Sequence, residues 1–348
     1  MSFNCAIGHP PIENRRVRLT FRYMSAFTFP ILSILSDGQF HSGEDLARHF
    51  NVTRATIWNA VKHAESLGIE IFSVRGRGYK LPNKINLLDK DAVLKAIGEQ
   101  RAWFNLEILD EVPSTNTYLM QLAAKGASHV TCVAAHIQSK GRGRRGRTWV
   151  SALGSSLTFS LLWRFECSAV ALSGLSLAVG VALIRALASQ GVNQAQLKWP
   201  NDVLVNNQKL AGILIDLQGD MDGPSAAVIG VGVNFNLPDS VLGSIDQPAI
   251  DVARASAKPI NQNVLLGTLL KYMADVLSDF EQRGFSGVRD EWMRYHAYHE
   301  KPVRMLLPDG RNVEGQVSGV AEDGILLVET ALGLQRFSAG EISLRGLN

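Results

Sequence analysis

The spacing of apolar residues changes along this 348-residue chain, and the change excludes a single repeating architecture. In the first quarter, short apolar segments such as Phe29–Leu35 have helical spacing. Further on, longer apolar runs at Leu106–Val112, Val130–Ile137 and Leu157–Phe165 predict strands, with helical segments between them. We therefore expect an α+β protein that begins with a separate, small helical domain.

The composition is that of a globular chain with more than one domain. With 46% hydrophobic and 19% charged residues, it is far from disordered sequences, and its length predicts two or three domains. Because the net charge is only +3, any DNA binding must come from a local basic patch. The wide spacing of Cys5, Cys132 and Cys167 favours neither disulfides nor a metal site. We expect a cytoplasmic protein without a membrane partner, since no apolar run approaches the roughly 18 residues of a membrane span.

The first 24 residues are basic and precede an apolar patch, as in a signal peptide. However, Pro30 interrupts the patch Phe27–Leu35, and no small-residue cleavage site follows it. We predict that residues 1–24 are a disordered leader and that Met24 is the native start.

Residues 25–82 have the pattern of a winged helix-turn-helix DNA-binding domain. Ser42 and Thr53 stand where they can cap two short helices, and Asn51-Val52 predicts the tight turn between them. The predicted DNA contacts are Arg54, Thr56, Asn59, Lys62 and His63 on the third helix, and Arg75 and Arg77 in the turn of a following hairpin. A three-helix module that docks to protein and binds no DNA is the alternative.

The segment Lys140–Arg147 carries five cationic side chains among eight residues, separated by glycines. It matches the spacing of the glycine-rich dinucleotide fingerprint, but a strand-like run follows where that motif requires a helix. It lacks the Gly-Lys-Ser/Thr of a Walker A loop as well. Two interpretations remain open: a solvated charge run, or an active-site loop whose arginines wrap a polyanion.

Two lysines and an aspartate are predicted to lie close together across a hairpin. Lys198 ends one strand-like run, Asp202 opens the hairpin, and Lys209 begins the return strand. Lysine supplies a point charge for phosphate or carboxylate, and a carboxylate can hold Mg²⁺. Beyond them, Gly230–Asn234 offers a strand of bare backbone that a flat ligand can approach.

Six segments that follow one another along the chain together resemble the biotin protein ligases, and the resemblance covers about residues 25–348. The segments are Ser114-Thr115-Asn116, Gln138, Gly141–Arg147, Lys198–Asp202, Lys209–Gly212 and Gly230–Asn234. The helix-turn-helix pattern resembles the bifunctional bacterial subgroup, which also represses biotin synthesis genes. The resemblance implies a central mixed-sheet ligase domain of the class II synthetase-like type over residues 83–300, and an SH3-like C-terminal domain over residues 301–348.

The resemblance also implies roles for individual residues. As catalytic residues, Arg142, Arg144 and Lys209 would neutralise the repulsion between the biotin carboxylate and the α-phosphate of ATP. The implied biotin pocket consists of Ser114, Thr115, Asn116, Gln138, Arg142, Gly143, Arg144, Lys209, Gly230 and Gly232. Lys198, Asp202 and Asn234 would contact ATP and Mg²⁺, with Asp202 as the metal ligand.

The implied reaction uses ATP and Mg²⁺ to activate biotin as biotinyl-5′-AMP. The biotinyl group is then transferred to a lysine of the biotin carboxyl carrier protein of acetyl-CoA carboxylase. Biotinyl-5′-AMP would also act as corepressor by favouring a homodimer on operator DNA. Three alternatives remain: a ligase whose N-terminal domain is regulatory but does not repress, a biotin sensor without transfer activity, and a lipoate ligase.

Two further expectations concern the C-terminal third. In the family, a loop after the last glycine-rich strand covers adenine, often with a tryptophan; here that loop is about residues 236–250 and holds no aromatic residue. We expect Val241, Leu242 or Ile250 to cover adenine instead. Apolar spacing predicts helices over Asn263–Phe280 and Val288–His299, and the short strands from Val303 onward predict a small barrel.

Overall fold

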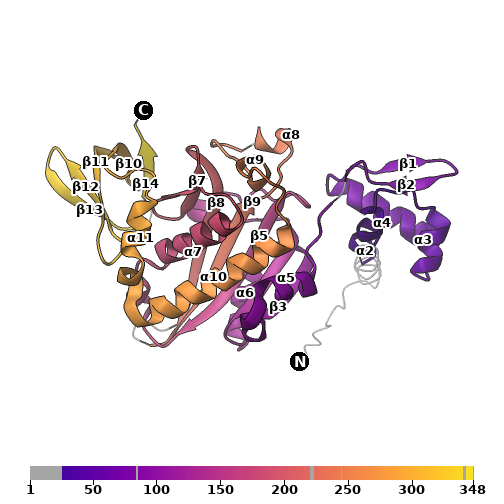
Figure 1. Cartoon of the computed structure of the whole chain (residues 1–348), viewed down its shortest axis with the longest axis horizontal. Coiled ribbons are helices and arrows are strands. Elements are labelled where there is room, and N and C mark those ends of the chain that lie inside the picture. The colour runs from indigo at the N-terminus through magenta and orange to yellow at the C-terminus, as the bar shows by residue number, and fades with distance from the viewer. Residues whose placement is uncertain (1–25, 84, 220–222, 244, 340–341, 348) are drawn as a thin grey trace, which may run out of the picture. The chain divides into compact units, whose positions relative to one another are not determined.

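The computed structural model describes residues 26–83, 85–219, 223–243, 245–339 and 342–347 (Figure 1). They form two compact units, one that ends at Leu87 and one that begins at Leu88. The predicted leader, residues 1–24, lies outside the described residues.

The N-terminal unit is a helix-turn-helix domain with a short hairpin. Its elements are α2 (Thr28–Leu35), α3 (Gly43–His49), α4 (Arg54–Ser66), β1 (Phe72–Val74) and β2 (Gly78–Lys80). Both predicted caps are present, because Ser42 Oγ accepts a hydrogen bond from Asp45 N at 3.0 Å and Thr53 Oγ1 accepts one from Thr56 N at 3.2 Å. Asn51, in the turn between α3 and α4, has a φ of 53°, which asparagine tolerates better than most residues.

The second unit is built on a seven-stranded mixed sheet. Its strands are β3 (Asn105–Val112), β4 (Thr131–Gln138), β5 (Ser156–Phe165), β6 (Gln196–Lys198), β7 (Asp202–Val205), β8 (Gln208–Gly219) and β9 (Ser225–Asn234). They lie in the order β3-β4-β5-β9-β8-β7-β6. Only β3 and β4 run parallel, and all other neighbours are antiparallel. This sheet confirms the predicted α+β architecture and its strand positions.

Helices cover both faces of this sheet (Figure 1). The helices of this unit are α5 (Lys90–Ile97), α6 (Thr115–Ala124), α7 (Leu175–Ser189), α8 (Asp239–Leu242), α9 (Val252–Ala255), α10 (Gln262–Arg283) and α11 (Arg289–Arg294). The main core forms where α7 and α10 pack on each other and on the sheet. On the other face, Leu119 of α6 packs with Val133, Leu162 and Val228. Helix α6 therefore holds its first turn against the middle strands.

One helical segment, Ala169–Ser189, is long and apolar enough to cross a membrane by length and composition, with a mean hydropathy of 2.0. The expectation that no apolar run approaches this length is therefore wrong. Ser173, Gly174 and Ser176 interrupt the apolar residues of this segment, but the segment as a whole stays apolar. Since 67% of its apolar 18-residue stretch is buried inside the protein, the segment is a core helix here. The absence of a membrane partner stays a prediction.

The helix predicted over Val288–His299 is shorter than expected, because α11 ends at Arg294. Beyond it, the backbone pairs with β6: Leu197 N donates to Tyr295 O at 2.7 Å, and Ala297 N donates to Leu197 O at 2.8 Å. Because Tyr295 O and Ala297 N both bond to Leu197, this backbone cannot also make helical hydrogen bonds. The contact with β6 therefore ends the helix that the local sequence pattern predicts.

The C-terminal part of the second unit is a five-stranded antiparallel sheet. Its strands are β10 (Pro302–Leu306), β11 (Asn312–Val320), β12 (Leu326–Thr330), β13 (Gly333–Phe337) and β14 (Ser343–Gly346), in the order β13-β12-β11-β10-β14. Strand β14 pairs with β10 and forms one edge of this sheet.

Candidate functional site

Two adjoining cavities lie in the second unit beside β7, β8 and β9. The larger, of about 330 Å³, is lined by residues that include Lys198, Asp202, Asn234 and Arg345. Every residue of the predicted biotin set lines the smaller cavity, of about 50 Å³. The cavities share Gly143, Arg144, Trp149, Asn201 and Lys209. The structure thus brings all the predicted ligand-binding residues of this unit together, with two cations at the junction.

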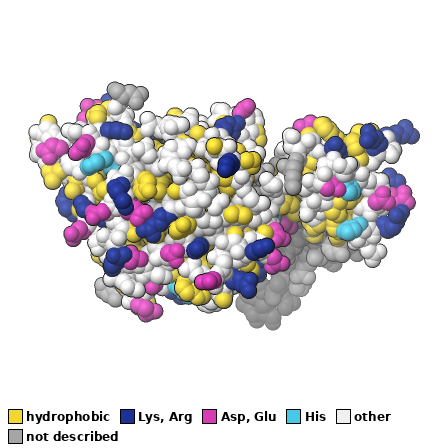
Figure 2. Space-filling model, in the orientation of Figure 1, with side chains coloured by type: hydrophobic (Ala, Val, Ile, Leu, Met, Phe, Trp, Pro, Cys, Tyr) yellow, Lys and Arg dark blue, Asp and Glu magenta, His cyan; other side chains and the backbone are white. Residues whose placement is uncertain are grey.

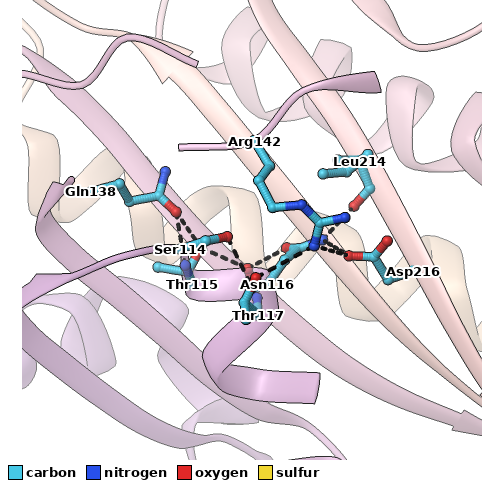
Figure 3. Close-up of polar contacts among 9 residues, drawn as sticks. Ser114, Thr115, Asn116, Thr117, Gln138, Arg142, Leu214 and Asp216 are labelled. Atoms are coloured by element: carbon cyan, nitrogen blue, oxygen red, sulfur yellow. Dashed lines mark hydrogen bonds and ion pairs between the residues drawn. The ribbon is translucent and has the colours of Figure 1, made fainter. Parts of the chain in front are cut away.

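A polar network at the start of α6 forms one wall of the smaller cavity (Figure 3). Ser114 caps α6 by accepting a hydrogen bond from Thr117 N at 3.4 Å. Gln138 Oε1, at the end of β4, accepts bonds from Thr115 N at 2.8 Å and from Thr115 Oγ1 at 3.1 Å. These bonds fix the orientation of the polar side chains that face the cavity.

Asn116 is only 3% exposed, and its polar atoms are engaged within the protein. Its Nδ2 donates to Leu214 O and to Asp216 Oδ2, both at 3.1 Å, while its Oδ1 accepts from Ser160 Oγ at 2.5 Å. Since an amide nitrogen has two hydrogens, both of its donors are used. Asn116 therefore ties α6 to β5 and β8.

Asp216 joins this network to the segment Lys140–Arg147, here called the arginine loop (Figure 3). The same Oδ2 that accepts from Asn116 also accepts from Arg142 Nη1 at 3.3 Å. Arg142 Nη1 lies 3.4 Å from the hydroxyl of Thr117 as well. The sequence analysis missed Asp216 and Ser160, because neither stands in a motif and both act over long sequence separations.

The glycines of β9 make room for side chains, in contrast to the bare strand that we predicted. A Cβ built on Gly230 would overlap the side-chain oxygen of Asn116, and one on Gly232 would overlap the indole ring of Trp149. Both glycines still line the smaller cavity. Their small size thus allows α6 and the arginine loop to close over the strand.

The arginine loop is docked against neighbouring elements. Arg144 Nη1 donates to Asn201 Oδ1 at 3.2 Å, and its Nη2 donates to the carbonyl oxygen of Ala339. Arg145 Nη1 donates to Ser343 Oγ at 2.9 Å. The loop therefore bridges the β6–β7 hairpin and the C-terminal sheet, a contact that the sequence did not predict.

The two lysines face the larger cavity beside the carboxylate of Asp202. Lys209 Nζ lies 2.7 Å from Asp202 Oδ1, and Lys198 stands opposite Asp202 in the backbone register of the β6–β7 hairpin. Burial lowers the pKa of Lys198 to about 8, and the neighbouring Asp202 carboxylate opposes this shift. The cavity is therefore strongly cationic at neutral pH, and its charge changes in the alkaline range.

Trp149 is an aromatic residue of the site that the sequence analysis missed. It lines both cavities, and Lys209 Nζ lies 5.7 Å from the centroid of its ring. Its buried Nε1 has no hydrogen-bond partner among the described residues. A buried donor without a partner is costly, so this group favours a ligand acceptor in the cavity.

The loop after β9 borders the larger cavity through Ile245, Asp246, Gln247 and Ala249. The described residues that line this cavity do not include Val241, Leu242 or Ile250, so their role as adenine cover stays a prediction, and Ile245 is a further apolar candidate. Val241 and Leu242 lie on α8, and Ile250 is buried at the base of the loop. At that base, Asn234 Nδ2 donates to the carbonyl oxygens of Lys209 and Ile250, both at 3.1 Å.

The carboxylates of the larger cavity fit a magnesium ion that arrives with a nucleotide. Asp202 and Asp246 line the cavity, and the described residues contain no cluster of three or more side chains suited to a metal ion. Mg²⁺ in nucleotide sites typically has one or two protein carboxylates and completes its shell with phosphates and water. These two carboxylates thus fit an ion whose remaining ligands are phosphates and water.

In the N-terminal unit, the predicted DNA contacts divide between two faces of α4. Arg54 and Lys62 are exposed, whereas Thr56, Asn59 and His63 are only partly exposed. The ring Nδ1 of His63 lies 3.0 Å from the hydroxyl of Thr28, beside the core. His63 therefore fits a structural role better than the predicted DNA contact.

The hairpin presents its arginines at an exposed turn. Arg75 and Arg77 are exposed, and Gly76 between them has a φ of 81°, which suits glycine. The guanidinium of Arg77 lies 4.2 Å from the centroid of the Phe40 ring. Figure 2 shows Lys and Arg side chains at the end of this unit that carries β1 and β2.

The domain matches define the class of protein. The model of the Biotin/lipoate A/B protein ligase family matches residues 109–234, an HTH domain model matches residues 28–80, and the Biotin protein ligase C terminal domain model matches residues 298–345. The chain is thus a protein ligase of the biotin and lipoate class with a helix-turn-helix domain in front.

Full-length relatives narrow this class. The bifunctional ligase/repressor BirA of Salmonella typhimurium is 34% identical over 315 residues, which cover 90% of this chain and 96% of that protein. The Escherichia coli BirA is 32% identical with the same coverage. The structure is also similar to the biotin protein ligase from Aquifex aeolicus in complex with biotin and ATP, with a TM-score of 0.60 and 30% identity over 70% of this chain and 99% of that one. This chain belongs to the family of bifunctional biotin ligases and repressors.

Proposed function

We propose that this protein activates biotin with ATP, transfers it to a lysine of a biotin carboxyl carrier protein, and represses biotin synthesis genes in response to biotin. The observation that carries the proposal is the pair of adjoining cavities, one small and polar and one cationic, which meet at Arg144 and Lys209. The names of the relatives, which combine ligase and repressor, support both activities.

The smaller cavity binds biotin. Ser114, Thr115 and Gln138 supply the polar wall, where hydroxyl and amide groups suit the donors and acceptors of a ureido ring. Gly230 and Gly232 line the same cavity, and Asn116 holds this wall in place through its engaged amide. Arg142, Gly143, Arg144 and Lys209 border the same cavity and receive the carboxylate end of biotin.

The larger cavity binds Mg-ATP. Lys198 and Lys209 supply positive charge for the phosphates, and Ile245 with Trp149 offers apolar surface to adenine. Asp202 would hold a magnesium ion that arrives with the nucleotide, and this ion would neutralise phosphate charge. Because both amide hydrogens of Asn234 are engaged, we assign Asn234 to positioning the backbone of Lys209, not to direct contact with phosphate.

The chemistry at the junction of the cavities follows from charge. The biotin carboxylate attacks the α-phosphorus of ATP, and Arg142, Arg144 and Lys209 reduce the repulsion between these two anions and align them. Pyrophosphate leaves, and the mixed anhydride biotinyl-5′-AMP remains in the closed site, protected from water. The amine of a carrier lysine then attacks the acyl carbon, and AMP leaves.

The remaining proposals concern architecture and partners. We assign residues 83–300 to a class II synthetase-like catalytic domain and residues 301–348 to an SH3-like domain. The mixed, largely antiparallel larger sheet and the antiparallel smaller sheet support these assignments. The protein acts in the cytoplasm, with the carrier protein of acetyl-CoA carboxylase as its substrate. Biotinyl-5′-AMP is also the corepressor, and it favours a homodimer whose two helix-turn-helix units bind operator DNA.

Biotin-dependent exchange of labelled pyrophosphate into ATP tests the first half-reaction, with lipoate as the competing substrate. We expect exchange with biotin and none with lipoate. Exchange with lipoate alone would identify a lipoate ligase, whose family model shares the matched domain. Binding of operator DNA only when biotin and ATP are both present would separate a repressor from a ligase with a merely regulatory N-terminal unit.

A further inference from the structure

The outward face of α4 contains two of the predicted DNA contacts, Arg54 and Lys62, together with Trp58, which the sequence analysis did not single out. Arg54, Trp58 and Lys62 stand four residues apart, so they form one stripe along the helix. All three are exposed, whereas Thr56, Asn59 and His63 are only partly exposed. The side chains that can reach a large partner are therefore those of the Arg54–Trp58–Lys62 stripe.

Trp58 stands out within this stripe, because 53% of this large apolar residue is exposed. The ammonium group of Lys62 lies 5.9 Å from the centroid of its ring, and Trp58 is not among the buried residues that form the core. Burying a tryptophan releases a large apolar area from water, so an exposed one between two cations suits contact with a partner that is both anionic and partly apolar. A duplex fits this chemistry, because thymine methyl groups lie between phosphate backbones in the major groove.

A second basic surface lies on the β1–β2 hairpin of the same unit. Arg77 and Lys80 lie 4.2 Å and 5.6 Å from the centroid of the Phe40 ring, which holds both cations near the start of α3. Arg75 is exposed at the hairpin turn. The hairpin therefore provides cations whose positions are set by packing, as a contact with the sugar-phosphate backbone requires.

We propose that Trp58 contacts the methyl groups of thymine in the operator and thereby helps to determine its sequence, while Arg54 and Lys62 contact phosphates on either side. This inference rests on the proposed repressor function. Apolar contact with a thymine methyl discriminates one base in the major groove, whereas phosphate contacts are the same for every sequence. Trp58 thus acts on specificity, and its two cationic neighbours act on affinity.

The test begins with duplexes selected by the wild-type protein, with biotin and Mg-ATP, from a pool with a randomised core. Fluorescence anisotropy then compares the wild-type protein with Trp58→Ala, Lys62→Ala and Trp103→Ala. Trp103 is the matched control, because it is 55% exposed but belongs to the second unit. Thermal melts by circular dichroism verify that each variant is folded.

Trp58→Ala is expected to weaken binding of the selected duplex on the order of tenfold, since loss of one base contact typically costs roughly 5- to 150-fold. Binding of random duplex and the salt dependence should not change. Lys62→Ala should weaken both duplexes and reduce the salt slope by about one. Replacing thymine by uracil in the selected site should weaken the wild-type protein but have no further effect on Trp58→Ala.

Wild-type affinity in Trp58→Ala, or a wild-type protein indifferent to uracil, would overturn the assignment of Trp58. A change in the oligomeric state or melting temperature of Trp58→Ala, with DNA affinity intact, would instead place this residue in contact with a second copy or with the second unit. If the wild-type protein selects no common sequence at all, the proposed repressor function itself fails, which is a distinguishable result.

Discussion

Raising the pH above 8 is expected to weaken ATP binding, because it removes the positive charge of Lys198 from the larger cavity. Burial lowers the pKa of Lys198 to about 8, well below the ordinary value for lysine. The cation is present below this pKa and is lost as the pH rises through it. Lys209, which resides in the same cavity, lies 2.7 Å from the Asp202 carboxylate and is paired with it.

The size of the effect follows from this pKa. At pH 9 only about one-tenth of the free enzyme carries the Lys198 cation, so kcat/KM for ATP should fall about tenfold relative to its value at pH 7. Saturating ATP should mask the loss, because bound phosphate favours the protonated lysine. The KM for biotin should change little over the same range, since Lys198 lines the larger cavity only.

Pyrophosphate release during biotinyl-5′-AMP formation, measured from pH 7 to pH 9.5 at several ATP concentrations, gives this profile. Lys198→Arg is the control, because a guanidinium stays protonated throughout and should flatten the profile. Equal profiles for the wild-type protein and this variant would refute the reasoning, whether both fell or both stayed flat.

Four further outcomes are expected. Lys209→Ala should abolish biotinyl-5′-AMP formation while circular dichroism shows an intact fold; normal pyrophosphate release would contradict its role. Arg144→Gly loses its bonds to Asn201 and the carbonyl of Ala339, so labelled biotinyl-5′-AMP should dissociate at least about tenfold faster in a filter assay. Asp216→Asn should raise the KM for biotin roughly tenfold with little change in kcat, because Arg142 and Asn116 share its Oδ2, and Asp216→Glu should restore part of the loss. Burial lowers the pKa of His296 to about 3. Below about pH 6.5 this histidine is therefore protonated in the unfolded chain, whereas in the folded protein it stays neutral until about pH 3. Stability should therefore fall with acidity, by on the order of 2 kcal/mol between pH 7 and pH 5, and urea midpoints that stay equal at the two values would rule this out.

The elements that the sequence predicted well are those fixed by local chemistry. Ser42 and Thr53 cap their helices as predicted, because a hydroxyl beside free backbone N–H groups needs no distant partner. The central strands β4 and β5 were predicted from apolar runs with few polar residues, which reflect burial on both faces. Local pattern is sufficient where the physical cause lies within a few residues.

The elements that the sequence did not predict depend on contacts between distant segments. Asp216 lies 74 residues from Arg142 and 100 residues from Asn116, and no motif joins them. Helix α11 ends early because Leu197 pairs with the residues after it. Trp58 was missed on α4 because polarity was used as the criterion for a DNA contact, whereas the four-residue spacing of Arg54, Trp58 and Lys62 would have identified the exposed stripe.

For the site residues, the sequence predicted which residues come together but not which of their atoms are free to bind a ligand. A binding motif indicates which segments lie together, and the structure brings the predicted residues of the second unit to two adjoining cavities. The motif does not indicate which of their polar atoms already form hydrogen bonds within the protein. Asn116 and Asn234 are both largely satisfied within the protein, so their roles shift from ligand contact toward positioning.

The central claim is most directly tested by the mass of a carrier domain after incubation with this protein. Purified protein, biotin, Mg-ATP and a biotin carboxyl carrier domain are mixed, and the carrier is examined by mass spectrometry, with a carrier whose target lysine is replaced by arginine as control. The proposed function predicts a gain of one biotinyl group that requires ATP and the target lysine. A carrier that stays unmodified under these conditions, or that gains only a lipoyl group when lipoate is supplied, would contradict it.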